Sequence, residues 1–121
     1  MSEGTKHDNG KLDYSLLPLE FVEDLVPVFA LGEERYTFNN WRKDFGPDYE
    51  RRFLAALKRH LDEVERHGPL AVNEKDGNVY HLAQIAWNAL CLLYHAKGKT
   101  KLSPLEMLNS MRAESAMTKG E

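Results

Sequence analysis

The sequence predicts an all-α protein, a compact bundle of three main helices with a further short helix near the C-terminus. Three segments carry apolar residues every three to four positions, which is the spacing of one helix face. Proline, glycine and capping residues bound these segments, and no run alternates apolar and polar residues as a half-buried strand does. The 121 residues are enough for one domain with its own hydrophobic core.

The first helix follows an N-terminal arm of residues 1–17, which is polar and contains glycine. We place the helical core domain at residues 18–96. Pro18 suits the first turn of a helix, and apolar residues then recur at helical spacing from Val22 to Phe29. Pro27 lies inside this pattern and has no N–H to donate, so it predicts a kink or a split in the helix.

The second helix is the most clearly bounded element. It runs from an N-cap at Asp48 to about His67, and Gly68 with the proline after it forms the stop. The connection before it, residues 37–47, contains Trp41, which we expect to fold back onto the core. The apolar face of the second helix consists of Phe53, Leu54, Leu57, Leu61 and Val64.

The third helix, from Tyr80 to His95, is apolar almost all round but carries a polar stripe at helical spacing. The stripe consists of His81, Gln84, Asn88 and His95. A helix this apolar should be buried, and a buried polar group without a partner costs roughly 1–3 kcal/mol. The stripe therefore predicts an internal polar site, which is a hydrogen-bond network, a metal or a small ligand.

Residues 97–121 are predicted to form a linker and a short helix with a frayed end. Ser103 and Glu106 have the spacing of a capping box, and Pro104 takes the first helical position. We expect this helix to end at about Glu114.

The composition excludes two broad classes of partner. A formal net charge of −3 gives no basic field for binding nucleic acid. No apolar run approaches the roughly 20 residues of a membrane span, and the polar N-terminus has no signal-peptide pattern. The single cysteine, Cys91, cannot form an internal disulfide, which fits a reducing compartment. We therefore predict a cytoplasmic protein that binds neither a membrane nor nucleic acid.

Carboxylates and histidines supply the candidate chemistry, because the chain has no nucleophile elbow, phosphate-binding glycine loop or paired-cysteine zinc pattern. Glu33, Glu34 and Glu63 are candidate metal ligands, and such oxygen donors suit Mg²⁺ or Mn²⁺. His60 and His81 are candidates for orienting water or ligand. The plainer interpretations are solvated helix faces for the glutamates and a hydrogen-bonded histidine at the edge of the core.

Cations of two segments are candidates for phosphate contact. A glycine-bearing arm with Lys6 and Lys11 can close over phosphate groups. On the second helix, bidentate contact with phosphate oxygens can come from Arg51, Arg52 and Arg59. The alternatives are a solubilising arm and surface salt bridges, which contribute little to stability.

Several short motifs, taken in order and spacing, connect most of the chain to a known family. They are Lys11-Leu12-Asp13, Phe29-Ala30-Leu31-Gly32, Asn40-Trp41, Arg59-His60-Leu61 and His81-Leu82-Ala83. This arrangement resembles the N-terminal domain of phage dATP/dGTP diphosphohydrolases, which are related to the all-α MazG-like nucleotide pyrophosphohydrolases. The resemblance extends over residues 6–94.

The resemblance implies an oligomeric helical fold that binds a (deoxy)nucleoside triphosphate, with a purine deoxynucleotide expected, together with Mg²⁺ or Mn²⁺. It implies cleavage between the α- and β-phosphates, which releases pyrophosphate, with His60 and His81 in catalytic positions. The substrate-binding residues that it implies are Lys11, Asp13, Tyr36, Trp41, Arg59 and Asn88.

The chain departs from the acidic MazG pattern at three places. Thr37 stands where a third glutamate would follow Glu33 and Glu34. Glu63 and Glu65 do not have the i,i+3 spacing of an acidic pair, and His81 with Gln84 stands where an acidic pair is expected. Two alternatives therefore remain open. One is a non-catalytic protein that binds and sequesters a nucleotide or a nucleotide-derived signal, and the other is a structural helical module.

Overall fold

The computed structural model describes residues 4–5, 7, 10–97 and 102–119. These residues form two units: the first comprises residues 18–99, and the second comprises residues 1–17 with residues 100–121. Both units are helical apart from one very small sheet, so the predicted all-α class is confirmed. No helix within the described ranges is both long and apolar enough to cross a membrane.

The first unit contains the main helices. Its elements are α1 (Leu19–Val22), η2 (Glu23–Leu25), α2 (Val26–Arg35), η3 (Asn40–Arg42), α3 (Tyr49–His67), β1 (Val72–Asn73), η4 (Glu74–Asp76), β2 (Val79–Tyr80) and α4 (His81–Lys97). The predicted split around Pro27 is confirmed, because α1 ends early and α2 begins with Pro27 in its first turn. The missing N–H of proline costs little at that position.

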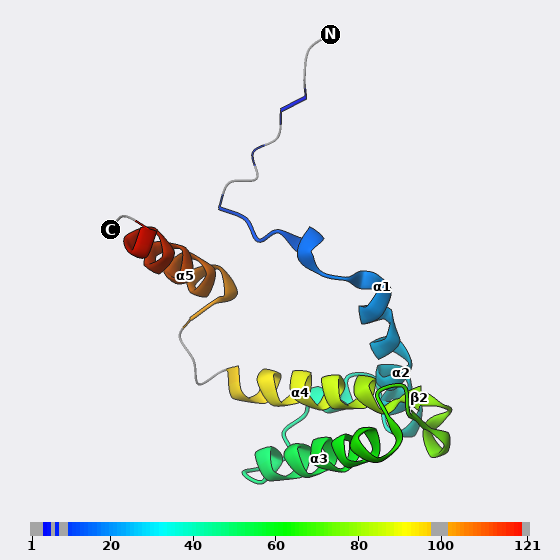
Figure 1. Ribbon diagram of the computed structural model, residues 1–121. Coiled ribbons are helices and arrows are strands. Elements are labelled where there is room, and N and C mark those ends of the chain that lie inside the picture. The colour runs from blue at the N-terminus through cyan, green and yellow to red at the C-terminus, as the bar shows by residue number, and fades with distance from the viewer. Residues whose placement is uncertain (1–3, 6, 8–9, 98–101, 120–121) are drawn as a thin grey trace. The chain divides into compact units, whose positions relative to one another are not determined.

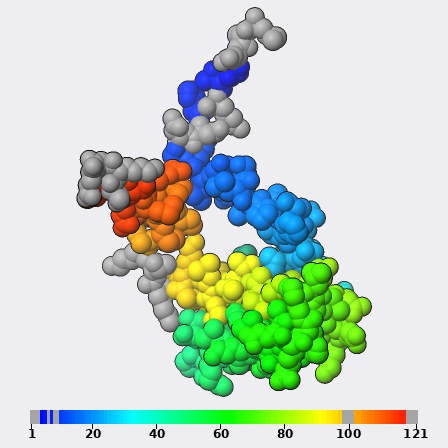
Figure 2. Space-filling model, viewed as in Figure 1, coloured from blue at the N-terminus to red at the C-terminus, as the bar shows by residue number. Residues whose placement is uncertain are grey.

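Helices α3 and α4 pack side by side along their lengths (Figure 1). They are antiparallel, since Phe53 stacks on His95 near one end and His60 meets His81 near the other. In the space-filling view the side chains of the two helices are in contact over most of this length (Figure 2).

A two-residue antiparallel hairpin connects α3 to α4. Val72 pairs with Tyr80, and Asn73 pairs with Val79. No strand was expected here, and that prediction was wrong because two residues are too few to show an alternating pattern. Gly68 ends α3 with φ 98°, as the predicted stop requires, and Gly77 turns the hairpin with φ 70°.

The polar stripe of α4 is its buried side. His81, Gln84 and Asn88 are all less than 10% exposed, so the predicted burial is confirmed for these three, whereas His95 is only half-buried. The expectation that α4 is buried all round was wrong, since Leu82 and Leu93 are 44% and 59% exposed. Cys91 is 0% exposed, and this burial raises the pKa of its thiol to about 12.

Two further expectations about α3 and its surroundings have clear outcomes. Trp41 does fold back, since His95 Nε2 donates to its backbone carbonyl over 2.7 Å. Asp48 holds the N-cap position of α3, but its carboxylate pairs with Arg51 instead of bonding to a helix N–H. Leu61 is 40% exposed, so the apolar face of α3 is only partly covered.

The second unit contains the 3₁₀ turn η1 (Tyr14–Leu16) and the helix α5 (Pro104–Lys119). The N-cap half of the predicted capping box is present, because Ser103 Oγ accepts from the N–H of Glu106 over 3.2 Å. The helix α5 continues to Lys119 and not only to about Glu114. Good helix formers such as alanine and methionine occupy its last turns, and no glycine interrupts it before position 120.

Candidate functional site

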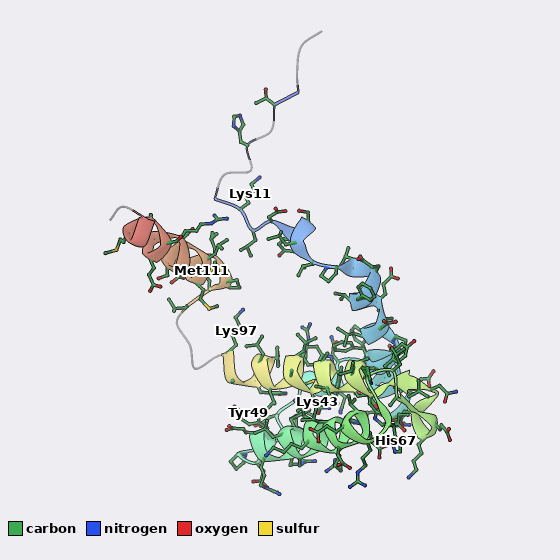
Figure 3. All side chains as sticks on the ribbon, viewed as in Figure 1. Lys11, Lys43, Tyr49, His67, Lys97 and Met111 are labelled. Carbon is green, nitrogen blue, oxygen red and sulfur yellow. The ribbon has the colours of Figure 1, made fainter. Side chains whose placement is uncertain are left out.

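A cavity of about 680 Å³ lies between α2, the η3 segment, α3 and α4. We call it the aromatic–arginine cavity. Its volume is within the range of small-molecule sites. Its polar and charged lining residues are Glu33, Tyr36, Thr37, Asn39, Asn40, Arg51, Arg52, Arg59 and Asn88. Figure 3 labels Tyr49 and His67 at the two ends of α3, the helix that contributes the three arginines.

Aromatic rings form the apolar wall of this cavity. Phe29 packs against Trp41 and Trp87 with ring centroids 5.6 and 6.3 Å apart. Phe53 meets Trp87 at 6.0 Å and Phe45 at 5.2 Å. These edge-to-face and tilted contacts are the favourable arrangements for aromatic pairs. The wall therefore consists of aromatic faces and edges, and a planar ring can pack against an individual face.

The arginines of α3 differ in how they are paired. Arg51 binds Asp48 over 2.8 Å, and Arg52 lies over the ring of Phe45, 5.8 Å from its centroid. Among the described residues, neither Arg52 nor Arg59 has an ion-pair partner. A guanidinium group binds phosphate or carboxylate oxygens in bidentate fashion. The cavity therefore offers two uncompensated cations to an anionic ligand.

Two buried polar atoms belong to residues that line the cavity from α4. Asn88 is 2% exposed, and its Nδ2 donates to the backbone carbonyl of Gln84 over 2.9 Å. Its Oδ1 and the indole Nε1 of Trp87 are both buried without a hydrogen-bond partner in the described part of the chain. Such atoms are rare in folded proteins and call for a specific explanation.

A second cavity of about 640 Å³ shares Arg59 with the first and is also lined by His60, Glu63, His67 and His81. We call it the histidine cavity. The Nδ1 atoms of His60 and His81 are 3.0 Å apart, so one imidazole donates and the other accepts. Burial, together with the neighbouring His81 and Arg59, lowers the pKa of His60 below its ordinary value. Glu63 lies 3.6 Å from His67 on the same helix.

Asp76 joins α2 and α4 through the hairpin. Its carboxylate accepts from Arg35, from Gln84 Nε2 over 2.7 Å and from Asn73 Nδ2 over 3.1 Å. Asn73 Nδ2 also lies 3.1 Å from Gln84 Oε1. Burial works to raise the pKa of Asp76, but the hydrogen bonds from Arg35 and Gln84 and the charge of Arg35 outweigh it and hold this pKa below its ordinary value. This network fixes the two helices that flank the aromatic–arginine cavity.

The structure divides the predicted site residues among several places. The aromatic–arginine cavity collects Glu33, Tyr36, Trp41, Arg59 and Asn88, and the histidine cavity collects Arg59, His60, Glu63 and His81. Glu34 is exposed and lies outside both cavities. The individual roles expected for these residues stay predictions.

Lys11 and Asp13 belong to the second unit, and both are exposed. The Asp13 carboxylate accepts from the N–H of Ser15 over 3.1 Å, so it acts as the cap of η1. The hydroxyl and backbone hydrogen bonds from Ser15 lower the pKa of Asp13. A role in substrate binding for either residue is still untested.

The predicted metal ligands do not form a cage. Within the part of the chain that the structure describes, no three histidine, cysteine, aspartate or glutamate side chains converge as a metal site requires. Glu33 and Glu63 line different cavities. The arrangement therefore does not fit a centre built from the three predicted glutamates.

Sequence reasoning singled out Arg51, Arg52 and Arg59 as cations of the second helix, and all three line the cavity. It did not single out Trp87 as a residue of the site. Trp87 gave no such signal, because an indole in an apolar helix is usually interpreted as core. Its unpartnered N–H is visible only in three dimensions.

Comparison with known proteins agrees with the expected resemblance. Residues 1–104 match the family described as dATP/dGTP diphosphohydrolase, N-terminal. A protein named dATP/dGTP diphosphohydrolase from Salmonella phage PMBT28 is 35% identical over 83 residues, which is 69% of this chain and 26% of the relative. The chain thus matches about a quarter of that relative's length. No solved structure matches the chain. Since the match covers most of its length, this chain belongs to the dATP/dGTP diphosphohydrolase N-terminal family.

Proposed function

We propose that the aromatic–arginine cavity binds a purine deoxynucleoside triphosphate. One observation carries the proposal: a single cavity of about 680 Å³ combines an aromatic wall with two guanidinium groups that have no ion-pair partner among the described residues. The base would pack against the aromatic wall, and the phosphates would bind Arg52 and Arg59. The name of the phage relative, dATP/dGTP diphosphohydrolase, supports this choice of ligand.

The electrostatics support an anionic ligand at this place. The whole chain has a formal net charge of −3, so a long-range positive field does not attract nucleotides. The local pairing of charges matters instead. Arg51, Arg35 and Arg66 are each neutralised by an aspartate, whereas Arg52 and Arg59 are not. A triphosphate would supply negative charge to these two exposed guanidinium groups.

The proposed reaction is hydrolysis between the α- and β-phosphates, which yields a monophosphate and pyrophosphate. Arg59 would stabilise negative charge that develops on the phosphate oxygens, since a preorganised cation is effective in this role. Dependence on Mg²⁺ or Mn²⁺ stays a prediction. Because the glutamates do not form a cage, no step of the reaction is assigned to a metal on this chain.

A non-catalytic nucleotide-binding protein is the second candidate function. The absence of a convergent acidic cluster within the described residues favours it. Both candidates predict nucleotide binding, and only the first predicts product.

The chain is further proposed to form a homo-oligomer through the outer face of α4. Leu82, Leu90 and Leu93 on that helix are 44%, 42% and 59% exposed. Contiguous exposed apolar side chains are typical of protein interfaces. Sedimentation velocity at micromolar concentration tests this proposal. A monomeric wild-type protein would refute the oligomer, and an oligomer that Leu93→Glu leaves intact would refute this interface.

The first experiment incubates the purified protein with dATP, dGTP, dCTP and dTTP, each with Mg²⁺, with Mn²⁺ and with EDTA. Chromatography resolves the products, and thermal shifts report binding. Monophosphate with pyrophosphate identifies the enzyme, whereas a higher Tm without product identifies the binder. No shift and no product with any nucleotide would refute both candidates.

A further inference from the structure

The two unpartnered polar atoms of α4, Asn88 Oδ1 and Trp87 Nε1, indicate which part of a nucleotide binds beside them. Asn88 Nδ2 donates to the carbonyl of Gln84, and a carbonyl can only accept, so the orientation of the Asn88 amide is fixed. Its Oδ1 is therefore an acceptor without a donor, and Trp87 Nε1 is a donor without an acceptor, among the described residues.

An unpaired acceptor together with an unpaired donor does not suit phosphate. Phosphate oxygens are acceptors with negative charge, so Asn88 Oδ1 would repel them. A nucleobase edge, in contrast, carries N–H donors next to ring-nitrogen or carbonyl acceptors. Both residues line the same cavity as the aromatic wall, and Trp87 is itself part of that wall. Arg52 and Arg59 supply the cations elsewhere in the cavity.

We propose that Asn88 and Trp87 form a base-binding subsite, in which Asn88 Oδ1 accepts from an N–H of the base and Trp87 Nε1 donates to an acceptor of the base. Adenine meets this requirement with its amino group and a ring nitrogen, and guanine meets it with its ring N–H and O6. Each of the two atoms exposes less than 1 Å² of surface, so a base contacts them only when side chains of the cavity move on binding. The subsite rests on the proposed nucleotide binding.

The subsite makes a prediction for the wild-type protein that needs no variant. dATP is compared with 2′-deoxynebularine triphosphate, which is the same nucleotide without the amino group. Leaving a buried acceptor unpaired costs roughly 1–3 kcal/mol, so the analogue should bind about tenfold more weakly. The quenching of tryptophan fluorescence is a suitable readout, since Trp41 and Trp87 both line the cavity.

Variants then assign the preference to a residue. In Asn88→Leu, dATP and the amino-free analogue should bind equally, because the acceptor that distinguishes them has been removed. In Trp87→Phe the preference for the amino group should persist. The wild type should bind 7-deaza-dATP or 1-deaza-dATP, each of which lacks one ring acceptor, more weakly than dATP, and Trp87→Phe should lose this difference. Asn40→Ala, at another amide of the same cavity, is the matched control and should retain both preferences.

The outcomes separate this inference from the proposed function. If wild-type protein binds dATP and the amino-free analogue with equal affinity, the subsite is refuted while nucleotide binding stands. If the preference is present but survives in folded Asn88→Leu, another residue reads the amino group and the assignment is wrong. If no nucleotide quenches the fluorescence or raises the Tm of the wild-type protein, the proposed function fails and the subsite fails with it.

Discussion

The aromatic–arginine cavity and the histidine cavity share Arg59 and have similar volumes, yet their polar groups are satisfied differently. In the histidine cavity, His60 bonds His81 and Glu63 lies beside His67. In the aromatic–arginine cavity, Arg52 has no ion-pair partner and Asn88 Oδ1 has no donor, among the described residues. Groups that are already paired gain little from a ligand. The comparison therefore favours the aromatic–arginine cavity as the ligand-binding site, and it favours a structural role for the side chains of the histidine cavity.

Removing the guanidinium that the cavities share should have the largest effect. Arg59→Gln is expected to weaken nucleotide binding about 10- to 100-fold, since a hydrogen bond to a charged group contributes about 1.5–3 kcal/mol. Stability should change little, because the side chain is exposed and has no ion pair to lose among the described residues. Isothermal titration with dATP measures the affinity.

The matched control for this variant is Arg66→Gln on the same helix. Arg66 pairs with Asp62 over 2.8 Å and lies outside both cavities. It should bind dATP as the wild type does. Equal losses in the two variants would mean that general charge, and not the cavity, attracts the nucleotide.

Disrupting the hydrogen-bond network of Asp76 should affect the stability of the fold more than nucleotide binding. Asp76→Asn is expected to lower the free energy of unfolding by about 1–2 kcal/mol, because the new amide cannot accept from both Arg35 and Gln84. The exposed side chain of Arg35 keeps the effect at this modest size. Urea unfolding measures it, and an unchanged midpoint would show that the network carries no net stability.

The same variant should change the response to acid. The folded-state pKa of Asp76 is lower than the unfolded value of about 3.9, so its contribution is complete above that value and is lost as the pH falls through the lower folded pKa. The wild type should therefore lose more stability than Asp76→Asn below about pH 4. Parallel acid-unfolding curves would contradict this.

The histidine pair should make stability fall at mildly acidic pH. The pKa of His60 is lowered by burial and by His81 and Arg59, so the folded state resists its protonation. The unfolded chain binds that proton from about pH 6.5 downward, and stability decreases from there to the lower folded pKa. His60→Asn should flatten this decline in thermal melts at pH 5–8, with dATP affinity near that of the wild type. A decline of unchanged slope would assign it to other groups.

The smallest effect is expected from Glu63→Gln. Its contact with His67 is long and exposed, so the free energy of unfolding should change by less than about 0.5 kcal/mol. Nucleotide affinity should also be unchanged, because Glu63 lies outside the aromatic–arginine cavity. Loss of turnover at unchanged affinity and Tm would instead give Glu63 a role in the chemical step, and would contradict the division of roles between the two cavities.

Local chemistry made much of the fold predictable. Pro27 had to interrupt a helix, Gly68 could end one, and Ser103 could cap one, and each does so. The buried polar stripe of α4 was also predictable, because buried amides and imidazoles at helical spacing require partners inside the protein. The exposure of Leu93 was not, since hydrophobicity alone does not tell which of two apolar faces meets a neighbouring helix.

The site was predictable only in part, because it depends on pairing between elements. The sequence identified Arg59 and Asn88, and both line the larger cavity. It gave no indication that Asp76 would hold α2 and α4 together, since Arg35 is 41 positions away. The sequence also predicted Glu33 and Glu63 as ligands of one metal, whereas in the packed structure of α2 and α3 they line different cavities.

The burial of Cys91 allows the local opening of α4 to be measured by chemical labelling. Its thiol is 0% exposed, and with a pKa of about 12 it is almost entirely protonated at neutral pH. Because only the thiolate reacts, an alkylating reagent can label Cys91 only when α4 separates from its neighbours and restores an ordinary thiol. The labelling rate therefore counts those separations, and a nucleotide that bridges α3 and α4 should slow it in proportion to the occupancy of the cavity.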